Sequence, residues 1–363
     1  MKTLQSIRSI HARAVDVPLN RPLGTSAATL RTAPLVLVDV TSEDGITGHA
    51  YLFAYTRAAG PAIISMLKGI EEMVTGHVVA PVDLGLKLAK RFRLIGVQGV
   101  VRMAIAAFDI CCWDILAKAA GQPLSHLLGA SASSVPAYNS NGLGLMEPAR
   151  VAAEALELLE PGFSAIKLRL GFPTMAEDLA NMRAVRRAVP DHVAVMVDFN
   201  QGLDLPEAMK RGYALDCEGA SWIEEPIRHD DYAGNAELAA ALQTPIQIGE
   251  NFSGPHAMAI AIAHRAADIM MPDLERIGGI TGWQRAAALA YAHDIPMSSH
   301  LFPEVSAHLM AATPTAHLLE YVDWANAILS EPLRIDDGRA VLSTAPGVGL
   351  AWDEKAISRY AYA

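Results

Sequence analysis

The sequence predicts an α/β protein in which a (β/α) barrel follows a smaller α+β unit. The chain has 363 residues, enough for about two domains. Its first third reads as strands followed by helices, and short apolar strands then alternate with amphipathic helices. We expect the α+β unit at 1–130, the barrel at 131–330, and a C-terminal segment at 331–363 that returns to the N-terminal unit.

The N-terminal third carries the pattern of an antiparallel meander covered by helices. Residues 4–17 and 33–51 are β-rich and alternate in polarity, with a turn at 42–45. Apolar positions recur at helical spacing over 57–75 and 98–120. Strands followed by helices predict an α+β unit.

From residue 135 onward the pattern becomes a repeat of strand and helix. Amphipathic helices are predicted at 147–160, 175–189, 205–218 and 282–293. Eight such units would form a TIM barrel, and a doubly wound open sheet is the competing arrangement. We favour the barrel because no glycine-rich phosphate loop follows any strand. The strand candidates begin near residues 135, 164, 193, 220, 245, 268, 295 and 318.

Composition excludes several classes of partner. The chain has 29 Lys and Arg against 39 Asp and Glu, a net charge of −10, and no basic run, which argues against nucleic acid and anionic membranes. It shows no membrane-spanning apolar stretch and no signal-peptide core. The three cysteines, Cys111, Cys112 and Cys217, form no CxxC motif and are predicted to be reduced thiols. We therefore expect a cytoplasmic protein.

A charged residue lies at the C-terminal end of nearly every predicted barrel strand, and these residues are about one βα repeat apart. In a closed barrel these ends meet at one mouth, where the active sites of such barrels lie. A functional cluster at this mouth is therefore predicted. Its members are Lys167, Arg169, Asp198, Glu224, Glu250, Asp273, His300 and Glu320.

Three carboxylates in this series come from adjacent strands. Asp198, Glu224 and Glu250 would repel one another unless a cation compensated them. An all-oxygen set without Cys or His favours Mg²⁺ over Zn²⁺. The alternative is a structural network in which Lys167 and Arg169 pair with these acids.

Asp273 and His300 end the next two strands and form a candidate proton-transfer pair. A carboxylate that accepts one imidazole N–H fixes the tautomer and leaves the second nitrogen free to move protons near neutral pH. We interpret His126, His264 and His317 as structural, because they lie outside the series.

These residues, in this order, resemble the enolase superfamily and, within it, the mandelate racemase subgroup. The resemblance covers essentially the whole chain and is most specific in IKLRLGFP, VDFNQGLD, WIEEP, GEN, MPDLERIGGITGW and SSHLFPEVSAH. It implies an N-terminal α+β domain capping a modified barrel, a small-molecule carboxylate as substrate, and a homo-oligomer such as an octamer.

The resemblance also implies removal of the proton α to the carboxylate of a 2-hydroxy acid, through an enolate stabilised by Mg²⁺, with Mn²⁺ as a substitute. A Lys or His base working with Mg²⁺ is the general pattern of this superfamily. By analogy, Asp198, Glu224 and Glu250 hold the metal. His300, oriented by Asp273, is the base on one face of the substrate.

The resemblance assigns further roles around the base. Glu320 would be a protonated acid that donates a hydrogen bond to the enolate, and Lys167 would bind the substrate carboxylate. Asn200 would face the substrate, and Ser140 and Asn141 could add polar contacts. The loops that face substrate in the subgroup are mostly apolar here, which suits an aryl or alkyl group. They carry Leu23, Ala27, Leu30, Phe53 and Tyr55, with Leu301 after the base.

One position departs from the subgroup pattern. Its Lys-x-Lys motif appears here as Lys167-Leu168-Arg169, and the second Lys is the base on the face opposite His300. Arginine is a far poorer base because its guanidinium keeps its proton in proteins. The first hypothesis is a mandelate racemase-like isomerase. Its rival is an acid-sugar dehydratase, a carbon–oxygen lyase with a single His base and Arg169 as a fixed cation. A catalytically disabled binding protein is a third hypothesis.

Overall fold

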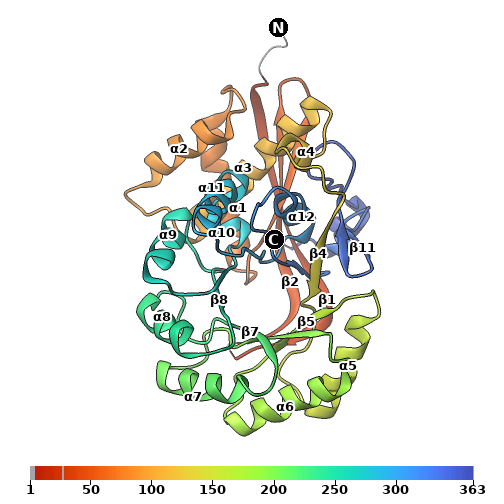
Figure 1. Cartoon of the computed structure of the whole chain (residues 1–363). Coiled ribbons are helices and arrows are strands. Elements are labelled where there is room, and N and C mark those ends of the chain that lie inside the picture. Colours follow the sequence, from red (N-terminus) through yellow and green to blue (C-terminus); the bar gives the residue numbers. More distant parts are fainter. Residues whose placement is uncertain (1–4, 27, 363) are drawn as a thin grey trace.

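The computed structural model describes residues 5–26 and 28–362, so Ala27 lies outside the described residues. A three-stranded antiparallel sheet with its helices precedes a parallel barrel, and a C-terminal segment follows (Figure 1). In the described part of the chain, no helix is long and apolar enough to span a membrane.

The capping sheet has the order β1-β2-β3, which confirms the predicted meander. β1 extends further than expected, and its far end reaches the barrel mouth, where Gly24 accepts a hydrogen bond from Leu145 N. Helix α3 is buried on nearly every side because it packs between this sheet and two barrel helices, α10 (Leu274–Ile277) and α11 (Gly279–Ala292). The elements are β1 (Ile7–Gly24), β2 (Thr29–Ser42), β3 (Thr47–Phe53), α1 (Ala59–Val74), α2 (Pro81–Phe92), α3 (Gly99–Ala120) and α4 (Leu124–Leu127).

The second part is a closed barrel of parallel strands. The strands run β4-β5-β6-β7-β8-β9 in order, and β10 pairs with β4 in parallel. Between β9 and β10, the strand predicted from residue 295 is reduced to isolated bridges: Met297 pairs with both Met270 and Ala316, and His300 pairs with Asp273. The barrel fold is thereby confirmed over the open sheet. Its strands are β4 (Ser134–Asn139), β5 (Ala165–Arg169), β6 (Ala194–Asp198), β7 (Ala220–Glu224), β8 (Ile246–Ile248), β9 (Ile269–Met270) and β10 (Leu319–Tyr321).

Helices alternate with these strands and surround the barrel (Figure 1). Helix α6 begins with a capping box in which Thr174 and Glu177 satisfy each other's backbone N–H groups. The four predicted barrel helices are confirmed to within a few residues. The barrel helices are α5 (Pro148–Leu159), α6 (Met175–Ala188), α7 (Leu205–Leu215), α8 (Tyr232–Ala241), α9 (Pro255–His264), α10 (Leu274–Ile277), α11 (Gly279–Ala292) and α12 (Pro303–Ala311).

The C-terminal segment contacts both parts of the molecule. It follows the short 3-10 helix η1 (Asn326–Ile328), and its hairpin of β11 (Arg334–Asp336) and β12 (Arg339–Val341) adds to the edge of β4 in the antiparallel sense. The last helix, α13 (Glu354–Tyr360), contacts β1 and η1. Trp352 Nε1 donates to Asp39 Oδ1 at 2.7 Å, so this segment is tied to the capping sheet.

Strand register brings the predicted cluster together. Arg169 pairs with Asp198, and Asp198 pairs with Glu224, across three neighbouring strands. Asp273 and His300 form a parallel bridge further round the barrel. The carboxyl ends of the strands therefore carry these side chains at one rim, beneath the far end of β1 and the end of β3.

Candidate functional site

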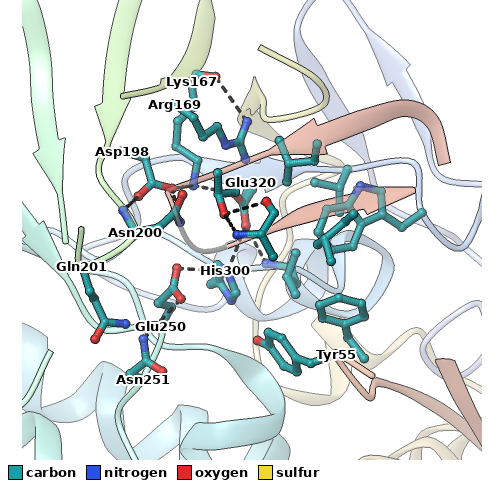
Figure 2. Close-up of a pocket in the computed structure, with 18 of the residues that line it drawn as sticks. Tyr55, Lys167, Arg169, Asp198, Asn200, Gln201, Glu250, Asn251, His300 and Glu320 are labelled. Carbon is teal, nitrogen blue, oxygen red and sulfur yellow. Dashed lines mark hydrogen bonds and ion pairs between the residues drawn. The ribbon is translucent and has the colours of Figure 1, made fainter. Parts of the chain in front are cut away.

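A cavity of about 380 Å³ lies between the barrel mouth and the cap (Figure 2). Three predicted residues, Ser140, Glu224 and Asp273, do not line it but contact residues that do. The predicted residues that line the cavity are Leu23, Leu30, Phe53, Tyr55, Lys167, Arg169, Asp198, Asn200, Glu250, His300, Leu301 and Glu320.

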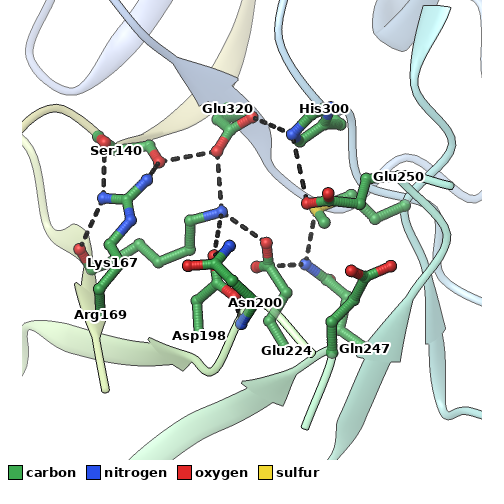
Figure 3. A network of polar contacts seen from close by, with 12 residues as sticks. Ser140, Lys167, Arg169, Asp198, Asn200, Glu224, Gln247, Glu250, His300 and Glu320 are labelled. Atoms are coloured by element: carbon green, nitrogen blue, oxygen red, sulfur yellow. Dashed lines mark hydrogen bonds and ion pairs between the residues drawn. The ribbon is translucent and has the colours of Figure 1, made fainter. Parts of the chain in front are cut away.

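Lys167 is the centre of the polar network beneath this cavity (Figure 3). Its Nζ lies 2.5 Å from Glu224 Oε1, 2.9 Å from Glu320 Oε1 and 3.5 Å from Asp198 Oδ2, and the residue is 1% exposed. Burial alone would lower its pKa, but Glu224 and Glu320 hold the pKa well above the ordinary value. Lys167 is therefore a buried cation, as the alternative of a lysine–carboxylate network expected.

The three predicted metal ligands are not gathered into one group in this structure. Across residues 5–26 and 28–362, no three His, Cys, Asp or Glu side chains lie close enough to hold a metal ion. Lys167 Nζ lies against Asp198 and Glu224, while Glu250 Oε2 turns to His300 Nε2 at 3.3 Å. The ammonium of Lys167 and the imidazole of His300 thus each take part of this acidic set as a partner.

The donor set nevertheless fits a divalent cation. Burial raises the pKa of Glu224 to about 8, and the nearby acids, Asp198 first, raise it against the opposing effect of Lys167. The carboxylates at this rim thus outnumber the cations that offset them. Oxygen donors on adjacent strand ends are the ligands that Mg²⁺ prefers, and Asp198, Glu224 and Glu250 could hold it.

His300 and Asp273 form a tightly held pair. His300 Nδ1 lies 2.6 Å from Asp273 Oδ2, and Asp273 Oδ1 accepts hydrogen bonds from the backbone N–H groups of Glu275 and Arg276 at 2.8 and 3.0 Å. These contacts fix the carboxylate, because it also caps α10. The imidazole is therefore held by a rigid acceptor, and Nε2 is the nitrogen on the cavity side, facing Glu250.

The charges around His300 determine its protonation. Burial lowers its pKa, but Glu250, Glu320 and Asp273 outweigh burial and raise the pKa to about 10. In this arrangement the ring is an imidazolium at neutral pH. It can serve as a base only when the charge of Glu250, the strongest of the upward influences, is engaged elsewhere.

The surroundings of Glu320 favour its ionised form in this structure, whereas the resemblance implies a protonated acid during the reaction. Its Oε1 accepts from Ser140 Oγ at 2.7 Å, and its Oε2 accepts from Leu301 N at 2.8 Å. Burial raises its pKa, but Lys167, then His300 and these donors, hold the pKa well below the ordinary value. The nearby cations thus account for the missing proton.

Arg169 is fixed by the loop after β4. Its Nη1 donates to the carbonyls of Ser140 and Gly142 at 2.7 and 3.0 Å, and its Nη2 donates to Ser140 Oγ at 2.8 Å. The residue is 4% exposed, and its Nε has no partner among the described residues. The guanidinium is therefore a held hydrogen-bond donor, and it makes no ion pair with Asp198, Glu224 or Glu250.

The two predicted asparagines are placed differently. Asn200 donates its backbone N–H and Nδ2 to Asp198 at 2.8 and 3.0 Å, and it lines the cavity. Asn141 Oδ1 accepts from Asp323 N at 3.1 Å, and Asn141 is absent from the cavity lining. Asn200 and its neighbour Gln201 have φ values of 45° and 62°, a strained backbone of the kind found at functional sites.

The cap supplies the apolar wall of the cavity. The Phe53 ring centroid lies 4.3 Å from that of Tyr55 and 5.1 Å from that of Trp324. Tyr55 also lies beneath the Arg276 guanidinium, with 4.6 Å between Cζ and the ring centroid. Arg276, which was not predicted from the sequence, thus places a positive charge beside the Tyr55 end of this apolar wall.

Several lining residues were not predicted. Gln201 and Asn251 directly follow predicted residues in the loops after the strands, which is the signal that could have found them. Arg276 lies within the PDLERIGG run. Trp324 and Val322 follow β10, beyond any charged strand end. The missed lining residues are Thr25, Ala28, Gln201, Asn251, Arg276, Val322 and Trp324.

Comparisons with known proteins agree with this architecture. Residues 8–129 match the mandelate racemase / muconate lactonizing enzyme N-terminal domain, and residues 150–356 match the enolase C-terminal domain-like family. The crystal structure of an enolase from Bradyrhizobium, complexed with magnesium and mandelic acid, superposes with a TM-score of 0.96 at 44% identity and covers 100% of both chains.

Two curated relatives catalyse different reactions. The L-talarate/galactarate dehydratase of Salmonella typhimurium is 35% identical over 348 residues, 94% of this chain and 87% of the relative. The L-Ala-D/L-Glu epimerase of Bacillus subtilis is 28% identical over 289 residues, 78% of this chain and 77% of the relative. The resemblance seen in the motifs is confirmed, and so is the prediction of an enzyme. This chain belongs to the mandelate racemase / muconate lactonizing enzyme family of the enolase superfamily.

Proposed function

We propose that the protein is a Mg²⁺-dependent enzyme that removes the α-proton of a 2-hydroxy carboxylate with His300 as its single base, and then expels a β-hydroxyl as water. The observation that carries this proposal is the pairing of a rigid His300–Asp273 dyad with an Arg169 guanidinium whose two terminal nitrogens donate to the loop after β4. One base is enough for dehydration, whereas racemisation needs a base on each face.

Asp198, Glu224 and Glu250 would hold the metal, which would neutralise the negative charge that develops on the substrate carboxylate as the α-proton leaves. Binding through Glu250 would also remove the strongest upward influence on the pKa of His300 and bring that pKa toward the range of a working base.

The chain's own residues would carry the proton. His300 Nε2 accepts the α-proton while Asp273 holds Nδ1–H, and the same Nε2–H then protonates the departing β-hydroxyl. Loss of the α-hydrogen and the β-hydroxyl leaves an enol, which tautomerises to a 2-keto acid. Lys167 supplies a cation for the substrate carboxylate, and Glu320 is positioned by Ser140 and Leu301 beside it.

Racemisation is the second candidate, and a different observation favours it. The cap wall of Leu23, Leu30, Phe53 and Tyr55 suits an aryl group better than a polyol, and a solved relative at 44% identity holds mandelic acid. This reaction would require a second proton carrier on the Arg169 side.

Proton NMR in D₂O separates these outcomes. Single enantiomers of mandelate and of six-carbon sugar acids are incubated with Mg²⁺, and keto acid is trapped with semicarbazide. Keto acid with no inverted substrate supports dehydration, whereas inversion with α-deuterium supports racemisation. Keto-acid formation or inversion that continues undiminished in His300→Asn would contradict the proposed chemistry.

A further inference from the structure

A second cavity adjoins the active-site cavity on the far side of Tyr55. It has a volume of about 460 Å³ and shares Tyr55, Asn251 and Arg276 with the first cavity. The rest of its wall comes from the start of α3, the loop before α8 and the start of α9. Those residues are Gln98, Gly99, Arg102, Met103, His229, Asp230, Tyr232, Ser253 and Ala257.

Arg102 in this wall is a largely buried cation without a counter-ion. In the part of the chain that the structure describes, its side chain makes no hydrogen bond and no ion pair, and its Nε is buried without a partner. Burial lowers its pKa, and the nearby Arg285 lowers the pKa further. Burial and the proximity of Arg285 both make the charged guanidinium of Arg102 less favourable, and a bound anion would offset this free-energy cost.

The backbone around Arg102 is shaped to admit its guanidinium. A Cβ at Gly254 would lie 2.9 Å from Nη2, and a Cβ at Gly278 would lie 3.3 Å from Nη1. Both glycines have positive φ, at 85° and 105°. The guanidinium thus occupies a slot between two glycines, and a side chain at Gly254 would displace it.

Two further groups that can interact with an anion lie beside the same space. Gly254 is the N-cap of α9 and offers no side-chain cap, so the positive end of that ten-residue helix is beside Arg102. Arg276 donates to Asn251 Oδ1 and, among the described residues, has no carboxylate within ion-pair distance, although Tyr55, Asp273, Glu250 and Glu275 are near enough to raise its pKa.

The negative charge in the lining is already engaged. Asp230 is paired with Arg228 through two hydrogen bonds of 3.0 and 2.7 Å. His229 is a neutral imidazole at neutral pH, because burial lowers its pKa. The cavity wall, within the described residues, therefore carries two arginines that have no ion-pair partner and no unpaired acid.

We propose that this second cavity is an oxyanion-binding site in which Arg102 and Arg276 hold a carboxylate or phosphate group. Arginine is suited to such groups because its planar fork donates two parallel hydrogen bonds. The oxyanion has two sources: the far acidic group of a dicarboxylic substrate whose reacting end lies at His300, or an independent small anion.

Isothermal titration calorimetry with inorganic phosphate tests the site in the full-length, Mg²⁺-loaded protein. We expect saturable 1:1 binding that Arg102→Gln weakens by more than about tenfold, because a charge-assisted pair is lost. Arg102→Lys retains the charge and should bind with intermediate affinity. Arg285→Gln is the matched control, since Arg285 neighbours Arg102 but does not line the cavity, and it should stay within about twofold of wild type.

Two results would overturn the proposal. One is no saturable phosphate binding by the wild-type protein, which needs no variant to interpret. The other is unchanged binding by a folded Arg102→Gln protein.

Competition then identifies the source of the oxyanion. Galactarate and galactonate differ only in the second carboxylate. Displacement of phosphate by galactarate but not by galactonate supports the substrate's far carboxylate, and displacement by neither supports an independent anion. Because phosphate binding is measured without turnover, it can succeed or fail independently of the proposed reaction.

Discussion

Replacing Asp273 with Asn should abolish most proton transfer while leaving the fold intact. Asp273 Oδ1 accepts from the backbone N–H groups of Glu275 and Arg276, so the amide of Asn must place its oxygen there. The amide NH₂ then faces His300 Nδ1, where Asp273 Oδ2 lies at 2.6 Å. That nitrogen must become an acceptor, and the ring proton moves to Nε2, which can no longer take the α-proton.

The structure sets the size of this effect. The opposite amide orientation would leave two backbone N–H groups facing a donor, at a cost of about 1–3 kcal/mol each. The inactive tautomer is therefore favoured by about 2–6 kcal/mol, which predicts a fall in kcat of roughly 30-fold to 10⁴-fold. The same exchange in a Ser-His-Asp triad lowers kcat by about 10⁴ through the wrong tautomer.

The assay is the initial rate of α-hydrogen exchange or keto-acid formation at saturating substrate and Mg²⁺. Asp353→Asn is the matched control, because Asp353 caps α13 by accepting from the N–H groups of the residues two and three positions on, as Asp273 does for α10. The reasoning is refuted if Asp273→Asn, shown to be folded, retains kcat within about threefold of wild type.

Three further substitutions test other parts of the account. Arg169→Lys restores the Lys-x-Lys spacing, and NMR should show that the variant gains α-hydrogen exchange from the second enantiomer. The variant should also be less stable, because the Ser140 and Gly142 carbonyls lose their donor. If a folded variant gains no exchange, another group limits proton transfer on the second face. Gly144→Ala places a Cβ 2.5 Å from Gly24 N and should lower kcat/KM by more than about tenfold, because it displaces the end of β1 from the barrel mouth. Gly69→Ala is the control, because its added Cβ would have no atom within 4 Å. Equal activity of the two variants would argue against a role for the contact between Gly144 and Gly24. Burial raises the pKa of Glu304 from 4.5 to about 7. The protonated form therefore adds up to about 3 kcal/mol to the free energy of unfolding at low pH, and this contribution is lost as the pH rises through 7. Urea unfolding at pH 5 and pH 8 should therefore show a smaller loss in Glu304→Gln than in wild type, and identical losses would place the ionisation elsewhere.

Much of the fold was predictable because βα repeats mark their strands by composition. The strand at 295 was overpredicted, because its backbone pairing is limited to isolated bridges at Met297 and His300 and to hydrogen bonds of Ser298 and Ser299. Hydrophobic patterning reports burial, and these residues are buried without forming a regular ladder.

The site was predictable in its strand-end residues and less so in its loops and charges. His300 and Asp273 lie as expected because strand order places them side by side. Arg276 belongs to the short α10, whose position over Tyr55 depends on the cap and barrel meeting. The protonation of Glu320 depends on contacts with Lys167 and Ser140 that no local pattern encodes.

The central claim is that His300 is the base that removes the α-proton. The most direct measurement is proton NMR of a single-enantiomer 2-hydroxy acid in D₂O with Mg²⁺, comparing wild type with His300→Asn. We predict that wild type removes the α-hydrogen, by exchange or elimination, and that His300→Asn loses this activity by at least about 10²-fold while remaining folded. Undiminished removal of the α-hydrogen by His300→Asn would contradict the account.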